Sequence, residues 1–353
     1  MAVRDIRQRR IDPIAQCTTL AAALMFDLHL ASALHCPAPL TKMGAHHHRG
    51  VPVIDLLLAL WPLFAMIVAG YWLRLREFPS EAFWPGAERL NYFILFPALL
   101  FSSLARAPLN NPALPRLALA VLLGLGIAWL ALLLVRRLRG WPAGRFGAFT
   151  QGILRFNTYL GLAAVGSLFG QEGLTLAALM LALMVPTVNV LSVWSLTAER
   201  GVSARSLLLP IIKNPLILAC VGGALFNLTG IGLPGGTDRL LSLLAAASLP
   251  LGLLCVGAAL KPAQLGGEIP ALTWNSALRL LAMPLLAWGV AWALALPAME
   301  SAVLVLFFAL PTAPTAYVLT RQLGGDSQLM AGIITLQTLL AAGSLVAIMM
   351  LLA

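Results

Sequence analysis

Ten apolar runs, each about as long as a lipid bilayer is thick, follow one another along this chain from residue 51 onward. A helix needs about 20 apolar residues to cross the hydrocarbon core. Only 10% of the residues are charged, against about 25% in a typical soluble domain. The sequence therefore predicts an all-α membrane protein. The expected spans are residues 52–73, 86–105, 114–135, 146–168, 173–198, 207–228, 238–260, 270–296, 301–321 and 327–352.

The net charge of +10 does not indicate nucleic-acid binding, because the basic residues lie in short loops between the apolar runs. The odd-numbered loops and their neighbouring span ends hold twelve Lys and Arg residues, and the even-numbered loops hold three. Cytoplasmic loops of membrane proteins are enriched in Lys and Arg. We therefore expect the odd loops to face the cytoplasm, in a multi-pass protein of the plasma (inner) membrane.

Residues 1–50 differ from the rest of the chain. A basic start followed by a moderately apolar stretch at 13–34 resembles a signal peptide. A mis-assigned translation start, with the protein beginning near Met43 or Val51, explains the segment equally well. The tract His46-His47-His48 can be read as a metal-binding tract or as a solvated tail. We expect this extension to lie outside the transmembrane fold.

The strongest pattern is an internal repeat with an offset of 153 residues. The offset pairs Pro62 with Pro215, Gly70 with Gly223 and Pro97 with Pro250. These residue types are common in this chain, so chance is the alternative explanation. The offset maps spans one to five onto spans six to ten, and because five is odd the two halves enter the membrane from opposite sides. The sequence thus predicts two inverted five-helix repeats, at 51–198 and 199–353, an architecture that recurs in secondary transporters.

Polar residues and helix breakers fall at matching positions in spans four and nine. Two prolines three residues apart in span nine remove two helix donors, and Asn157 in span four maps next to the first of them. Transporters of this kind bind solutes near the bilayer midplane, where helices are broken. Together with one residue of span five, these segments supply the expected substrate site: Arg155, Asn157, Tyr159, Asn189, Pro311, Thr312, Pro314 and Thr315.

Single residues within the spans have more than one interpretation. Arg155 can attract an anionic substrate, pair with backbone carbonyls or snorkel to the cytoplasmic surface. Arg279 in span eight can also snorkel. Asn189 and Gln337 can line a cavity or form hydrogen bonds between helices. A proline within a span can simply bend its helix.

The acidic residues lie at span ends or in loops, and we expect none at a span centre. A proton relay or a carboxylate-built sodium site therefore lacks its usual residue. Uncoupled transport, and coupling through backbone and amide oxygens, both remain open. The four cysteines form no C-x-x-C pair and are expected to be buried thiols, so we predict no metal site and no cofactor.

Four stretches carry a likeness to a known family: Leu90–Phe101, Arg155–Gly161, Lys213–Leu251 and Pro311–Asp326. In them the chain resembles the auxin efflux carrier family, whose bacterial members are often described as malate or malonate permeases. The resemblance implies crossing broken helices at spans four and nine. It also implies a scaffold of spans one, two, six and seven, against which a transport domain moves in an elevator-like manner. The related fold is that of the bile-acid/sodium symporters.

The resemblance further implies small organic anions, including carboxylates, as substrates. Span nine carries Thr312 and Thr315 but no asparagine, where many relatives have an amide, which leaves the substrate open. We expect a secondary-type transporter working by alternating access, with lipid and substrate as partners and a homodimer left open. A sodium-coupled symporter of the bile-acid type is the first alternative. A membrane protein with an enzymatic or sensory role is the second, and it is disfavoured because no histidine follows His48 and no loop can hold a soluble domain.

Overall fold

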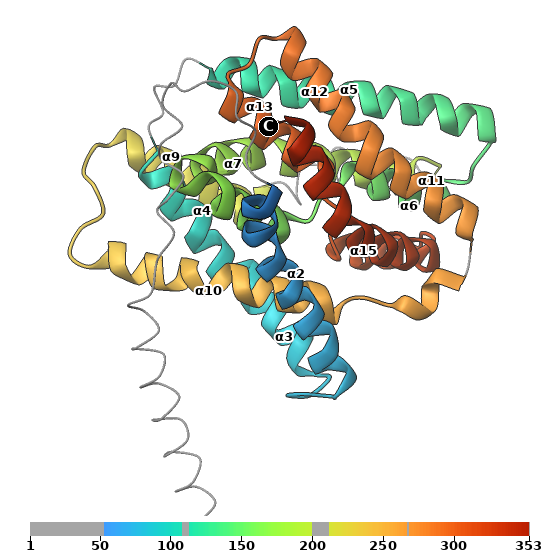
Figure 1. Cartoon of the computed structure of the whole chain (residues 1–353), viewed down its shortest axis with the longest axis horizontal. Helices are drawn as coiled ribbons and strands as arrows, with labels where there is room; N and C mark the ends of the chain where they lie inside the picture. Colours follow the sequence, from blue (N-terminus) through green and yellow to red (C-terminus); the bar gives the residue numbers. More distant parts are fainter. Residues whose placement is uncertain (1–52, 108–112, 200–211, 267, 353) are drawn as a thin grey trace, which may run out of the picture. The chain divides into compact units, whose positions relative to one another are not determined.

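The computed structural model describes residues 53–107, 113–199, 212–266 and 268–352, and the N-terminal extension at 1–50 lies outside them. The described residues form helices joined by short loops, with no β-strand among them (Figure 1). The predicted all-α class is therefore confirmed. The helices are α2 Val53–Leu75, α3 Phe83–Leu90, η1 Asn91–Leu95, α4 Phe96–Ala105, α5 Leu114–Arg139, α6 Ala143–Leu154, α7 Thr158–Thr197, α9 Pro215–Leu228, α10 Thr237–Ala258, η2 Pro262–Gly266, α11 Ile269–Ala277, η3 Leu278–Ala282, α12 Met283–Ala293, α13 Ala298–Ala309, α14 Thr315–Gln322 and α15 Ser327–Leu352.

Six helical stretches in the described part of the chain are long and apolar enough to cross a membrane. They are Leu56–Leu75, Leu114–Arg139, Ala143–Thr197, Thr237–Ala258, Ile269–Ala293 and Ser327–Leu351. The helices α9 and α13 are apolar but shorter. The chain is therefore a multi-pass membrane protein, because each of these stretches would otherwise expose its apolar face to water.

The third stretch, Ala143–Thr197, contains 55 residues, far more than one crossing needs. It is interrupted twice. Residues 155–157 are extended between α6 and α7, and Gly170 within α7 adopts φ +59°, a conformation that favours glycine. The chain can therefore reverse near Gly170, which separates the ranges expected as spans four and five.

Two pairs of helices pack at the level of their backbones. Helix α2 crosses α10 and packs against it, and α4 packs against α9 (Figure 1). A Cβ atom at Gly70 would overlap the backbone of Leu254, and one at Gly223 would lie 2.7 Å from the carbonyl oxygen of Phe101. The two crossings correspond through the offset found in the sequence, because 70 + 153 = 223 and 254 − 153 = 101.

A second pair of contacts follows the same offset. The Arg74 guanidinium donates to the carbonyl of Ala258 at the end of α10. At the corresponding position, 74 + 153 = 227, the Asn227 Nδ2 donates to the carbonyls of Leu104 (3.0 Å) and Ala107 (2.9 Å) at the end of α4. In both pairs a polar side chain satisfies carbonyl groups that a helix end leaves without an intrahelical partner.

The π-helical turn η1 is fixed by a buried amide. Asn91 Nδ2 donates to the Ser248 carbonyl at 3.0 Å, and Ser248 Oγ donates back to Asn91 Oδ1 at 2.9 Å. Both side chains are fully buried. Hydrogen bonds of this kind join helices where lipid offers no alternative partner. The bond therefore sets the direction of the residues that follow Asn91.

The crossing of α2 and α10 predicts a sharp difference between two glycines. Gly70→Ala should lower the melting temperature of the purified protein, because overpacking a close contact costs about 1–3 kcal/mol. Gly126→Ala in α5 is the matched control, since no atom lies within 4 Å of its added Cβ and alanine favours a helix by about 0.5–1 kcal/mol. Thermal unfolding in detergent measures both. Equal melting temperatures for the two variants would contradict the proposed backbone contact.

Candidate functional site

Two breaks in the chain meet inside the helical bundle. Helix α6 ends at Leu154 and α7 begins at Thr158, while α13 ends at Ala309 and α14 begins at Thr315. The backbone N–H of Asn157 in the first break donates to the carbonyl of Pro311 in the second at 2.8 Å. Segments more than 150 residues apart in sequence are thus joined by a main-chain hydrogen bond at the point where both helices are interrupted.

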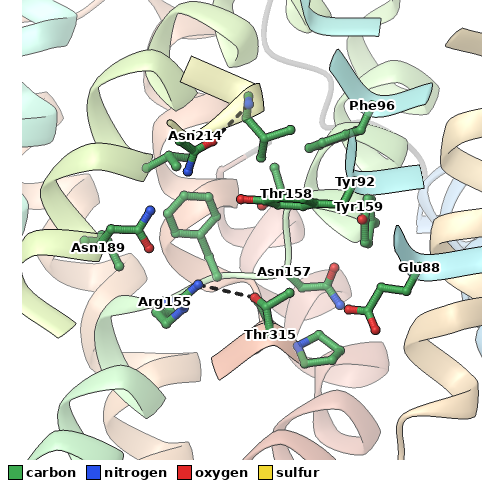
Figure 2. A pocket seen from close by; sticks show the side chains of 16 residues that line it. Glu88, Tyr92, Phe96, Arg155, Asn157, Thr158, Tyr159, Asn189, Asn214 and Thr315 are labelled. Atoms are coloured by element: carbon green, nitrogen blue, oxygen red, sulfur yellow. Dashed lines mark hydrogen bonds between the residues drawn. The ribbon is translucent and has the colours of Figure 1, made fainter. Parts of the chain in front are cut away.

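A pocket of about 70 Å³ lies beside this crossing (Figure 2). On the scale of one water per 10–15 Å³ of such volume, the pocket has room for a handful of waters or a small solute. Its lining comes from α3, η1, α4, both breaks, α7 and the start of α9. The lining residues are Glu88, Tyr92, Phe96, Arg155, Phe156, Asn157, Thr158, Tyr159, Val185, Val188, Asn189, Asn214, Leu216, Ala313, Pro314 and Thr315.

Two hydrogen-bond donors of the first break have no partner within the described part of the chain. Arg155 Nη2 donates to Thr315 Oγ1 at 3.3 Å, but its Nη1 is buried without a partner. Asn157 Oδ1 accepts from the backbone N–H of Leu160 at 3.1 Å and so caps α7, whereas its Nδ2 is buried without a partner. Buried donors are almost always satisfied in folded proteins. Both residues line the pocket, so an acceptor bound there would complete their bonding.

Three helices begin at the pocket. Asn157 precedes α7, Pro314 precedes α14, and Asn214 precedes α9, where its Oδ1 accepts from the backbone N–H of Leu216 at 2.9 Å. A helix N-terminus carries a partial positive charge and N–H groups that point outward. Together with the Arg155 guanidinium, the three helix starts make this a place where negative charge is favoured.

One carboxylate also lines the pocket. Glu88 lies on α3, one turn before Tyr92 and two turns before Phe96, so these three residues share one helix face. No salt bridge of Glu88 occurs among the described residues. Sequence reasoning missed Glu88 because it lies near a span end. Its i, i+4, i+8 spacing with two aromatic residues is the signal that would have found it.

Six of the eight predicted site residues line this pocket: Arg155, Asn157, Tyr159, Asn189, Pro314 and Thr315. Pro311 and Thr312 do not. The Thr312 N–H donates to Gln337 Oε1 at 2.8 Å, and its Oγ1 lies 2.7 Å from the carbonyl of Gly152. The polar groups of these two residues are thus bonded within the protein, since the Pro311 carbonyl accepts from the Asn157 N–H.

Gln337 forms hydrogen bonds between helices and does not line the pocket. Its Nε2 donates to the Gly152 carbonyl and to Asn275 Oδ1, both at 2.9 Å, and Asn275 Nδ2 donates to the Phe149 carbonyl at the same distance. This buried network joins α15, α11, α6 and the second break. The sequence left open whether Gln337 lines a cavity or forms hydrogen bonds between helices, and the structure shows the hydrogen bonds.

Arg279 does not snorkel to a membrane surface. Its side chain is 1% exposed, and its three nitrogens donate to the carbonyls of Leu310, Ile153 and Phe307. The snorkelling interpretation failed because the sequence cannot show that two helix ends, from α6 and α13, supply acceptors in the interior. Arg279 lies behind the crossing and is absent from the pocket lining.

Within the described ranges, no group of three His, Cys, Asp or Glu side chains could hold a metal ion. Cys220 and Cys255 are buried free thiols. The tract His46-His47-His48 lies outside the described residues.

Comparison with known proteins finds similarity to membrane transporters. Residues 199–349 match the family model described as "Membrane transport protein". A protein of Methanothermobacter thermautotrophicus described as an "Uncharacterized transporter" is 28% identical over 292 residues, which is 80% of this chain and 94% of that relative. Both similarities agree with the multi-pass architecture. The chain is therefore similar to membrane transport proteins, which supports its resemblance to the auxin efflux carrier family.

Proposed function

We propose that this membrane transporter carries small organic anions, in particular carboxylates, by alternating access. The observation that carries the proposal is the pair of unpartnered donors, Arg155 Nη1 and Asn157 Nδ2, in a pocket where three helices begin. A carboxylate offers two oxygens with several acceptor positions. Its oxygens could accept from either donor, whereas a cation or an apolar solute would leave both donors unsatisfied.

The remaining lining suits a small solute with one charged end. Four apolar side chains contribute to the same lining: Phe96, Phe156, Val188 and Leu216. Apolar walls exclude water and strengthen a charge-assisted hydrogen bond. Asn189 and Thr158 add amide and hydroxyl groups that can select among substrates with different second polar groups.

The origin of the lining supports the expected movement. Glu88, Tyr92 and Phe96 belong to expected span two and Asn214 lies beside the start of α9, both parts of the proposed scaffold. The break residues and α7 belong to the proposed transport domain. A pocket between the two parts would open to opposite sides of the membrane as one part moves past the other.

The contacts related by the offset of 153 residues support ten spans in two inverted five-helix repeats. Gly70 against Leu254 and Gly223 against Phe101 are corresponding contacts of corresponding helices. Inverted repeats provide two related states that open to opposite sides. The proposed location is the plasma membrane, and the charge difference between the odd and even loops supports an orientation with the odd loops in the cytoplasm.

Arg155→Gln should raise the half-saturation concentration for a carboxylate substrate about 10- to 150-fold, because a hydrogen bond to a charged group contributes about 1.5–3 kcal/mol. The assay is counterflow of labelled malate, malonate and an indole carboxylate into liposomes that contain the purified protein. Arg116→Gln is the matched control, since this exposed arginine lies outside the pocket. If the folded wild-type protein transports none of the three anions, the substrate class is wrong.

Asn157 has two roles that one substitution can separate. Asn157→Asp keeps the acceptor that caps α7 and replaces the free donor with an acceptor, so the melting temperature should change little while anion uptake is lost. Asn157→Ala removes both groups and should lower the melting temperature as well, by an N-cap contribution of about 1 kcal/mol. Uptake by Asn157→Asp at the wild-type rate would show that the Nδ2 group does not contact the substrate.

Glu88→Gln should lower the half-saturation concentration for an anion about three- to tenfold at neutral pH. The substitution removes a charge of the same sign as the substrate from the pocket lining while it preserves shape. Glu81→Gln serves as the control, because Glu81 is exposed and lies outside the pocket. The same counterflow assay applies, and an unchanged concentration dependence in Glu88→Gln would remove Glu88 from the substrate site.

A further inference from the structure

The pocket lies at the N-terminal ends of helices, where partial positive charge gathers. The C-terminal ends of the two interrupted helices carry the opposite partial charge. Helix α6 ends at Leu154 and α13 ends at Ala309, so both of these ends lie at the crossing. A helix C-terminus carries partial negative charge and carbonyl groups without intrahelical partners. In many transporters such half-helix ends and unwound carbonyls coordinate a coupling cation.

Here a side chain occupies that position. Arg279 Nε donates to the Leu310 carbonyl at 2.5 Å, Nη1 to the Ile153 carbonyl at 2.6 Å, and Nη2 to the Phe307 carbonyl at 3.1 Å. The first and third acceptors belong to the end of α13, and the second belongs to the end of α6. Within the described ranges Arg279 takes part in no salt bridge. Its charge is therefore balanced by backbone carbonyls of both helix ends.

Burying the Arg279 charge costs free energy unless acceptors such as these carbonyls balance it. The side chain is 1% exposed, and an arginine in a span normally faces a water cavity or a partner. Its position is set by η3, a π-helical turn at Leu278–Ala282 in the middle of the α11–η3–α12 segment. Single π-turns within α-helices are frequent at functional sites.

We propose that Arg279 is a built-in cation that holds the two interrupted helices together and takes the place of a bound coupling ion. The guanidinium fixes the positions of Ile153 and Leu310, and each of these lies within a few residues of the pocket lining. Arg279 is therefore a positioning residue. The consequence for coupling rests on the proposed transport function: anion transport needs no sodium ion at this crossing. The structural part of the proposal stands independently of the substrate.

The first test measures thermal unfolding of the purified protein and needs no substrate. Arg279→Ala should lower the melting temperature by about 10 °C, because it leaves buried carbonyls of two helix ends unsatisfied. Millimolar guanidinium chloride, but not choline chloride, should restore part of this loss by filling the vacated site. Arg116→Ala is the control, since this exposed arginine also donates to a carbonyl, that of Ala295 at 3.4 Å. An equal response of both variants to guanidinium would overturn the proposal.

The wild-type protein provides a second test that does not depend on a variant that folds. Its melting temperature should be the same in sodium and choline salts of equal ionic strength. A saturable stabilisation by sodium alone would overturn the proposal, because it would show an ion site that Arg279 does not fill. Counterflow in the same two salts should then give equal rates. Absence of uptake in both salts would remove the proposed substrate class and leave the unfolding results to decide the role of Arg279.

Discussion

A helix that is interrupted inside a membrane exposes backbone groups that lipid cannot satisfy, and the centre of this protein is organised around that constraint. The N–H of Asn157 is satisfied by the Pro311 carbonyl and the N–H of Thr312 by Gln337. The carbonyls of Ile153 and Leu310 are satisfied by Arg279. The two side-chain donors of the first break that lack a partner among the described residues, Arg155 Nη1 and Asn157 Nδ2, belong to residues that line the pocket.

The same arrangement divides the crossing into two electrostatic faces. Three helix starts and Arg155 lie at the pocket, where they favour an anion. Two helix ends lie behind it, where Arg279 supplies the compensating positive charge. Two arginines thus have different tasks within one crossing: one keeps a nitrogen free, and the other has all three nitrogens bonded to the backbone.

The all-helical class, the presence of long apolar helices and both breaks could be predicted from the sequence, because bilayer thickness sets the length of an apolar run and because proline removes a helix donor. The sequence could not predict which residues of the breaks point into the pocket. Outside a helix no period relates Thr312 to Thr315, so only the tertiary structure shows that the first bonds Gln337 and the second lines the pocket. The hydrogen-bond partners of Arg279 could not be predicted either, since its Ile153 acceptor lies 126 residues away in sequence.

The packing on the two sides of the pocket differs in kind, and that difference bears on the proposed movement. At Gly70 and Gly223 the helices of the proposed scaffold touch through their backbones, so they cannot slide without a clash. Across the pocket, contacts are made by side chains, such as the edge-on rings of Phe96 and Tyr159 at 5.0 Å. Side-chain contacts of this kind can be exchanged by changes of rotamer. In the proposed cycle the scaffold therefore stays one rigid unit, and the transport domain is displaced along the surface that contains the pocket.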